Sequence, residues 1–228
     1  MMEQPTSPRP RVLFLSDHLG YADGVIHGAT RYFLNVLPRI DPQKIDLTVC
    51  FLRDRHPAVQ QLQQQGIEPI FLNRAKWDPR SLSDLTRLIR ERDIELLHLA
   101  GMKGCLIGRI AARLTHRRAI IHLHDTRSPG LVIGTLQRRV ARWTDLALAV
   151  SAEVGRLATH DFAIPPQRVQ VLHNGIVLSD FTSRSSEHRQ QVRQEIKLTP
   201  QMQAIGVIGR LAPEKNHAAL IGVMPAIL

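Results

Sequence analysis

The 228-residue sequence lacks the cysteine patterns and the long apolar runs that define several classes of protein. Its two cysteines, Cys50 and Cys105, lie in apolar runs without a CxxC or histidine-rich neighbourhood, so neither a disulfide framework nor a zinc module is predicted. No apolar run approaches the roughly 20 residues that span a bilayer, and the N-terminus lacks the apolar stretch of a signal peptide. We therefore expect a cytoplasmic protein, either soluble or attached to a membrane surface from that side.

Aromatic residues are also scarce, at 4%, although the formal net charge is +10. The charge favours anionic partners such as phosphates, nucleotides or acidic lipids. Binding to nucleic acid is poorly supported, because no module combines basic residues with aromatic side chains that stack on bases. The G-x-G-x-x-G spacing of dinucleotide-dependent dehydrogenases is absent as well, so that class of enzyme is not favoured.

What the sequence does contain is a regular alternation of short apolar runs with longer segments of helical periodicity. This alternation begins at Val12 and is typical of an α/β fold with a Rossmann-like parallel sheet. Three helices are predicted from their apolar periodicity. The first begins near Ala29, the second follows Asp78 and Pro79 as its N-terminal pair, and the third covers 106–114. Strands are predicted at 12–15, 47–52, 70–72, 94–99, 119–123, 146–150 and 169–172.

The pattern changes after residue 178. We expect a disordered N-terminus at 1–10, a first domain at 11–178, a linker at 179–200 with a short helix over 187–198, and the start of a second domain at 201–228. In this last segment, the apolar run 204–208 is predicted to be a strand, and a helix should follow from about Asn216. One strand and one helix cannot bury their apolar faces alone, so we expect this second Rossmann-like domain to be truncated.

Polar residues and glycines follow the predicted strands. In open α/β sheets, ligands bind beyond the carboxyl ends of the strands, so these residues are expected to line a cleft. The loop from Asp17 to Gly28 would let a ligand approach backbone N–H groups, although a merely flexible connection is an equal alternative. The other expected cleft residues are Gly101, His124, Asp125, Ser151, Asn174 and Gly175, together with Gly209 near the end of the chain.

His122 and His124 alternate along one strand and therefore point to the same face. A metal site would need a third ligand such as His98 from a neighbouring strand, and no carboxylate supports it, so no bound metal is predicted. We interpret His124, at the strand end, as a hydrogen-bonding group in the cleft. His122 is interpreted as a structural residue within the sheet layer.

Near the end of the chain, Gly209, Arg210 and Lys215 precede the helix predicted from Asn216. Two cations beside a helix N-terminus suit a diphosphate, whose charge is stabilised by the cations and by free N–H groups. The alternative is that these are two solvated charges in a loop.

Five segments, taken in order, resemble the GT-B glycosyltransferases of group 1, also called family 4. They are residues 27–31 (HGATR), 124–125 (HD), 149–151 (AVS), 171–176 (VLHNGI) with Phe181 after it, and 209–216 (GRLAPEKN). The resemblance implies two Rossmann-like domains facing across a cleft, and retaining transfer of a sugar from a nucleotide-sugar donor to a saccharide or lipid-linked acceptor. No cofactor or metal is implied.

By this resemblance, His124 contacts the sugar and is the catalytic candidate, Gly28 lines the donor phosphate and sugar region, and Arg210 and Lys215 neutralise the departing diphosphate. The chain differs from the family at Thr30, where glutamate is common, and at Val177, where an acidic residue is frequent. The paired glutamates of the later second domain are absent. We therefore expect this polypeptide to be inactive alone.

Two further interpretations are open. A non-catalytic binding or scaffold protein derived from a truncated glycosyltransferase is the alternative function. Peripheral association with an anionic membrane is suggested by a basic and apolar face over 131–144, together with arginines on or just after the preceding helix. Those arginines are Arg109, Arg113, Arg117 and Arg118. An ordinary solvated surface would explain the same residues.

Overall fold

The computed structural model describes residues 9–20, 26, 28–53, 55–75, 78–126, 129–182, 186–209, 211 and 213–227. The chain divides into two compact units, residues 1–176 and 177–228.

The first unit is built on a parallel sheet of seven strands in the order β3-β2-β1-β4-β5-β6-β7. The strands are β1 (Arg11–Ser16), β2 (Asp46–Phe51), β3 (Ile70–Phe71), β4 (Leu96–Ala100), β5 (Arg118–Leu123), β6 (Leu146–Ala149) and β7 (Val169–Val171). Each lies within two residues of its predicted bounds. The strand order is that of a Rossmann-like sheet, so the predicted α/β class is confirmed.

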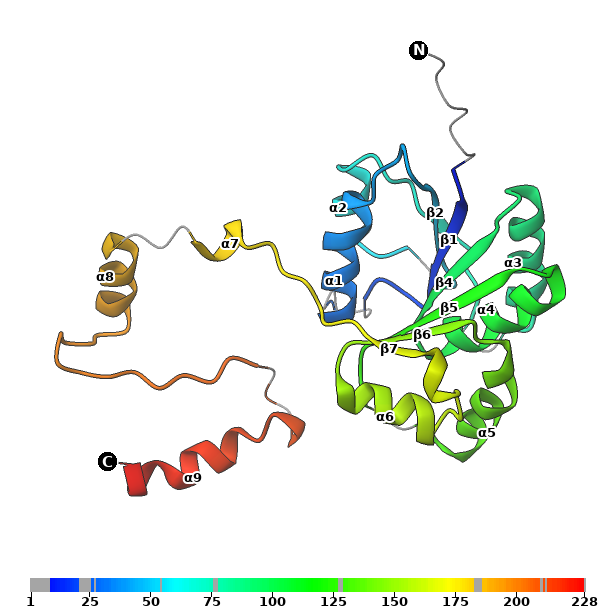
Figure 1. The fold of residues 1–228 in the computed structure, drawn as a ribbon. Coiled ribbons are helices and arrows are strands. Elements are labelled where there is room, and N and C mark those ends of the chain that lie inside the picture. Colours follow the sequence, from blue (N-terminus) through cyan, green and yellow to red (C-terminus); the bar gives the residue numbers. More distant parts are fainter. Residues whose placement is uncertain are drawn as a thin grey trace, which may run out of the picture. The chain divides into compact units, whose positions relative to one another are not determined.

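Helices connect the strands and cover both faces of the sheet (Figure 1). They are α1 (Gly28–Val36), η1 (Leu37–Arg39), α2 (Val59–Gln63), α3 (Arg80–Glu91), α4 (Met102–Thr115), α5 (Leu131–Val140), η2 (Ala141–Trp143), α6 (Ala152–His160) and η3 (Pro166–Arg168). Helix α3 begins at Arg80 with Pro79 at its cap, one residue later than predicted. Asp78 still satisfies a free helix N–H, because its Oδ1 accepts from the backbone of Arg80 at 2.9 Å.

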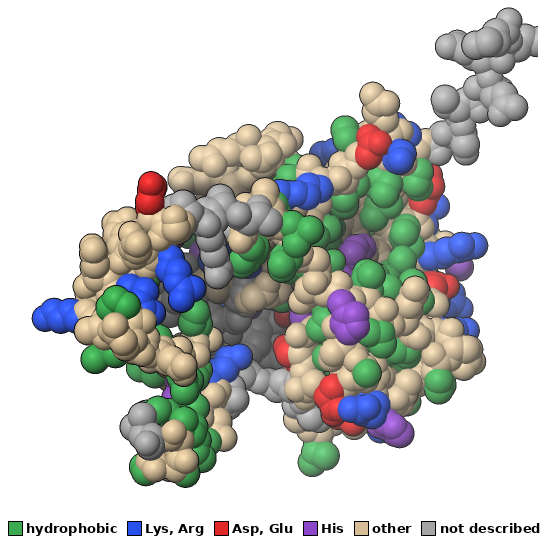
Figure 2. All heavy atoms as spheres, turned by 60° about the vertical axis from the view of Figure 1, so that its left-hand side comes forward, with side chains coloured by type: hydrophobic (Ala, Val, Ile, Leu, Met, Phe, Trp, Pro, Cys, Tyr) green, Lys and Arg blue, Asp and Glu red, His purple; other side chains and the backbone are tan. Residues whose placement is uncertain are grey.

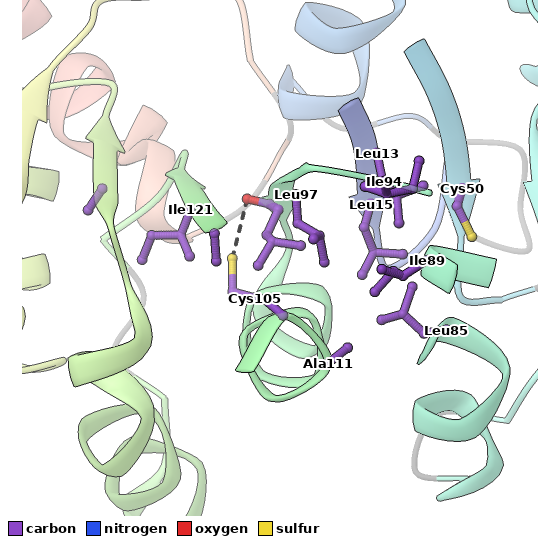
Figure 3. Close-up of a cluster of buried hydrophobic side chains, with 14 of the residues drawn as sticks. Leu13, Leu15, Cys50, Leu85, Ile89, Ile94, Leu97, Cys105, Ala111 and Ile121 are labelled. Carbon is purple, nitrogen blue, oxygen red and sulfur yellow. Dashed lines mark hydrogen bonds between the residues drawn. The ribbon is translucent and has the colours of Figure 1, made fainter. Parts of the chain in front are cut away.

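The alternation of side chains along each strand produces two hydrophobic clusters, one on each face of the sheet. On β1, Leu13 and Leu15 join the cluster that is covered by α3 and α4. Phe14 points the other way, into the cluster formed with α1 and α2. Figure 3 shows the first cluster, in which the Cys105 thiol donates to the Leu99 carbonyl at 3.5 Å. Both faces of the central strands are therefore buried, as a parallel sheet requires.

The second unit contains α7 (Ser179–Thr182), α8 (Ser186–Glu195), η4 (Pro213–Lys215) and α9 (His217–Ile227). Helix α8 ends earlier than the predicted 187–198, because Lys197 adopts a left-handed φ of 55°, which a right-handed helix cannot continue. Helix α9 begins one residue after the predicted start.

The predicted strand at 204–208 is wrong, because the structure gives these residues no regular secondary structure. A strand is stabilised by backbone hydrogen bonds to a neighbour, and no strand is present among the described residues of this unit. Ile205, Val207 and Ile208 are consequently exposed. Their apolar pattern indicated a tendency to form a strand, but pairing decides whether one forms.

Figure 2 shows Lys and Arg side chains at several places on the surface in view, beside apolar and other side chains. Within the described part of the chain, no helix has both the length and the hydrophobicity needed to cross a bilayer.

Candidate functional site

Strands β2 and β3 are added to the sheet on one side of β1, and β5, β6 and β7 are added on the other side of β4. The strand order therefore reverses between β1 and β4, and a crevice forms there. Ligands bind at such a switch point, beyond the carboxyl ends of the strands. A cavity of about 570 Å³ lies here in the first unit. Its lining includes the aromatic ring of Phe33 on α1, the ionisable side chains of Asp17 and Lys103, and the apolar side chains of Leu157 and Phe162.

Asp17 directly follows β1 and reaches the N-terminus of α4. Its Oδ2 accepts from the Lys103 N–H at 3.1 Å, and its Oδ1 accepts from the Gly104 N–H. Gly101, at the end of β4, has a φ of +76°, and a Cβ there would come within 2.7 Å of the Asp17 Cγ. Burial raises the pKa of Asp17, while the two backbone hydrogen bonds oppose that rise.

Lys103 is a buried cation beside this carboxylate, with 4% of its surface exposed. Its Nζ donates to the Ala75 carbonyl at 3.1 Å and to the Ser81 Oγ at 3.2 Å. Burial lowers its pKa, and the negative charge of Asp17 opposes that decrease. Lys103 thus links α4 to the start of α3 while it lines the cavity.

Three histidines form a stack on the sheet face that α1 covers. His98 on β4 and His122 on β5 have their rings 5.3 Å apart and nearly parallel, and the His98 Nε2 lies 3.1 Å from the His122 Nδ1. The His124 ring follows at 4.3 Å from that of His122. Burial lowers the pKa of all three, to about 4 for His98, about 3 for His122 and about 4 for His124. The stack is therefore uncharged at neutral pH.

Aromatic side chains of α1 surround this stack. The Phe33 ring lies 4.8 Å from the His124 ring and 5.4 Å from the His122 ring. The Tyr32 ring lies 5.2 Å from that of His124. An apolar aromatic wall next to neutral hydrogen-bonding rings can hold a polar but uncharged molecule, with one face of the molecule against the aromatic rings.

The cavity brings together Gly101, His124 and Asp125 of the residues predicted for the cleft. Gly28 is the first residue of α1 and is exposed, whereas its neighbour Ala29 lines the cavity. The structure places the remaining predicted residues of this unit outside the cavity lining. Ser151 caps α6, where its Oγ accepts from the Val154 N–H at 3.3 Å, and Asn174 and Gly175 are exposed after β7.

The predicted diphosphate loop belongs to the second unit. Lys215 is exposed, and its side chain lies close to Gly209, where a Cβ would be 3.5 Å from the Lys215 Cγ. The predicted phosphate ligand Arg210 lies outside the described residues. The described residues contain no group of three or more His, Cys, Asp or Glu side chains that could hold a metal ion.

The predicted basic face is wrong at Arg109, which is fully buried. Its guanidinium donates to the Cys105 carbonyl at 2.9 Å, to the Thr144 Oγ1 at 3.0 Å and to the Gln137 Oε1. These neutral acceptors satisfy the charged group inside the packing of α4 against α5 and η2. Helical spacing alone could not separate this arginine from the exposed Arg113 on the same helix.

Asp17 and Lys103 were not singled out as site residues by the sequence. Asp17 began a loop noted for its glycines, and the available signal was a carboxylate directly after the first strand. Lys103 follows Gly101 after another strand, which is the same kind of signal. Their pairing depends on β1 and β4 being neighbours, and the sequence alone does not state this strand order.

Comparisons with known proteins agree with this architecture. The sequence model of Glycosyltransferase Family 4 matches residues 26–180. An Escherichia coli UDP-Gal:alpha-D-GlcNAc-diphosphoundecaprenol alpha-1,3-galactosyltransferase is 25% identical over 148 residues, which are 61% of this chain and 38% of that protein. The chain thus spans well under half of this curated relative.

Two solved structures share the fold. HepE from Anabaena, in complex with UDP, has a TM-score of 0.75 at 20% identity and is matched over 95% of this chain and 57% of its own. A glycosyltransferase from Rickettsia africae has a TM-score of 0.77 at 13% identity, over 97% of this chain and 58% of its own. Because the family match covers more than half of its residues, the chain belongs to Glycosyltransferase Family 4, with a first unit of the GT-B type.

Proposed function

We propose that this chain is the acceptor-side part of a retaining glycosyltransferase that moves a hexose from a UDP-sugar to a saccharide or lipid-linked acceptor. The observation that carries the proposal is the cavity at the β1–β4 switch point, with neutral histidines and aromatic rings at one side. Family membership supports it. The choice of a UDP-sugar is supported by the galactosyltransferase relative and by the UDP complex of HepE.

In this proposal His124 contacts the transferred sugar, as the catalytic candidate, and Gly28 borders the donor phosphate and sugar region. Arg210 and Lys215 neutralise the charge that develops on the leaving diphosphate, with no metal or other cofactor required. Because such stabilisation is greatest in the transition state, loss of either cation should lower turnover more than it weakens donor binding. Residues 1–228 by themselves should be inactive, since the donor site needs a complete second half.

A lipid-linked acceptor is supported by the surface next to the cavity. Pro129, Gly130 and Ile133 line the cavity, and the adjacent Leu131 and Val132 of α5 are 92% and 73% exposed. Exposed Arg139 and Arg142 follow on the same helix and on η2, while α5 contains no acidic residue. Apolar side chains beside cations suit the interface of an anionic bilayer, at the cytoplasmic face of a membrane.

Sugar transfer tests this function directly. A polypeptide in which residues 1–228 continue into a complete second half should transfer hexose from a UDP-sugar to a saccharide carried on a prenyl diphosphate. Binding without transfer would favour the alternative, a non-catalytic scaffold derived from a glycosyltransferase.

A further inference from the structure

The strongest unassigned feature is a buried ring nitrogen at the cavity. His122 lines the cavity with only 2% of its surface exposed, and its Nε2 has no hydrogen-bond partner among the described residues. Both ring nitrogens of His124 are also buried without a hydrogen-bond partner among the described residues. Most buried polar atoms in folded proteins are hydrogen-bonded, so an unpartnered nitrogen in a residue that lines a cavity needs an explanation, and a ligand in the cavity would supply one.

The other nitrogen of His122 is already occupied. Its Nδ1 lies 3.1 Å from the Nε2 of His98, so one of these two atoms donates and the other accepts. If His98 donates, both rings carry their proton on Nε2, the tautomer that a free imidazole side chain prefers. If His122 donates, both rings must carry it on Nδ1. The first arrangement is favoured, and it leaves the His122 Nε2–H as a donor at the cavity.

The charge state of the stack limits what this donor can bind. Burial lowers the pKa of both rings far below neutrality, and the proximity of other histidines lowers that of His122 further. A neutral imidazole provides no charge to neutralise a phosphate. A hydroxyl group can accept from His122 and, in turn, donate to an accepting nitrogen of His124, and the rings of Tyr32 and Phe33 flank the same site.

We propose that His122 contacts the ligand, donating from its Nε2–H to a hydroxyl of a hexose, and that His98 is a positioning residue that holds His122 in this tautomer. The inference rests on the proposed function for the choice of a sugar as ligand. It differs from the sequence-based interpretation of His122 as purely structural. His98 is not part of the cavity lining and acts only through His122.

The test is long-range ¹H–¹⁵N NMR on the 228-residue chain labelled with ¹⁵N-histidine, with His122→Asn to assign the His122 signals. In the unmodified chain, His122 should be protonated on Nε2 and unprotonated on Nδ1. His98→Gln should preserve this tautomer, because its side-chain amide can still donate to Nδ1. His98→Leu should produce a mixture of tautomers. Circular dichroism shows whether each variant is folded.

Galactose, glucose and N-acetylglucosamine are the ligand probes, and inorganic phosphate is the charged control. At least one hexose should shift the His122 Nε2 resonance, and phosphate should not. His98→Leu should weaken the hexose response by the factor by which it lowers the fraction of His122 protonated on Nε2, at most about twofold because the free ring already prefers that tautomer, and His98→Gln should restore it.

The proposal is overturned if His122 carries its proton on Nδ1, if folded His98→Leu leaves the tautomer and the hexose response unchanged, if no hexose shifts the resonance, or if phosphate shifts it as much as a hexose does. A failure of the transferase proposal would give a different result. In that case His122 would still respond to hexose, but the complete enzyme would transfer no sugar.

Discussion

The Asp17 carboxylate lies directly against the backbone of Gly101, so that a Cβ at Gly101 would come within 2.7 Å of the Asp17 Cγ. This contact joins the ends of β1 and β4, the two strands that flank the crevice. The position therefore requires glycine for two reasons, the φ of +76° and the closeness of Asp17.

Gly101→Ala should lower the free energy of unfolding more than Gly66→Ala does. Gly66 has a similar φ of +79° but open space where a Cβ would lie, so its substitution introduces only backbone strain, roughly 1–2 kcal/mol. Gly101→Ala adds the displacement of Asp17 from α4. Urea unfolding of the two variants measures the difference, and equal losses would show that the Asp17 contact contributes nothing.

Arg109 and Gln137 should behave as a coupled pair. Gln137→Leu removes a side-chain acceptor from a buried guanidinium and should destabilise the chain by about 1–3 kcal/mol. Arg109→Met should also destabilise it, since Gln137 and Thr144 lose their donor. The double variant should lose less than the sum of the single losses. Additive losses in a double-mutant cycle would exclude this coupling.

The histidine stack should make the first unit less stable in acid. The unfolded histidines take up protons as the pH falls below about 6.5, whereas the folded ones do so only near pH values of about 4, 3 and 4. Between these limits the unfolded state binds more protons, so stability decreases as the pH falls. The raised pKa of Asp17 acts in the opposite direction, since the folded state then binds more protons than the unfolded state at pH values above the ordinary pKa of 3.8.

Each shifted histidine contributes up to roughly 1.4 kcal/mol per pH unit in this window. His122→Gln should therefore flatten the dependence of unfolding free energy on pH between 6.5 and 4. His116→Asn, at an exposed position outside the stack, is the control. An equal slope for His122→Gln and the unmodified chain would contradict the neutral state assigned to the buried ring.

The α5 surface predicts binding to membranes. The chain should co-sediment with vesicles that contain phosphatidylserine but not with neutral vesicles, and binding should weaken as salt increases. Leu131→Ser with Val132→Ser should reduce the bound fraction. Leu114→Ser, at a 52% exposed position on α4, is the matched control. Equal binding to acidic and neutral vesicles would argue against this docking surface.

The sequence predicted the strands of the first unit well, since most of them, from 12–15 to 169–172, are mainly apolar runs bounded by polar residues. Local periodicity carries this information. Periodicity does not show whether a neighbouring strand is available for pairing, and the prediction of a strand at 204–208 was wrong for that reason. Nor does it distinguish a buried from an exposed arginine on one helix, as Arg109 shows.

The candidate site was predictable only in part. His124 and Asp125 could be placed at the cavity because they end a strand, and the ends of parallel strands meet at one edge of the sheet. The hydrogen bonds of Asp17 to α4, and of His98 to His122, each join residues on different elements. Such pairings follow from strand order and register, which one sequence does not determine.

Sugar transfer by the chain, with and without a complete donor-binding half, tests the proposed activity most directly. The assay supplies UDP-galactose, UDP-glucose or UDP-N-acetylglucosamine and a saccharide on a prenyl diphosphate, and NMR determines the anomeric configuration of the product. Residues 1–228 alone should give no product, and the completed polypeptide should give one with the configuration of the donor retained. In that polypeptide, Lys215→Ala should reduce turnover on the order of 10²-fold, whereas the exposed Arg189→Ala should not. Absence of transfer from every donor by the folded, completed polypeptide, or a product of inverted configuration, would contradict the account.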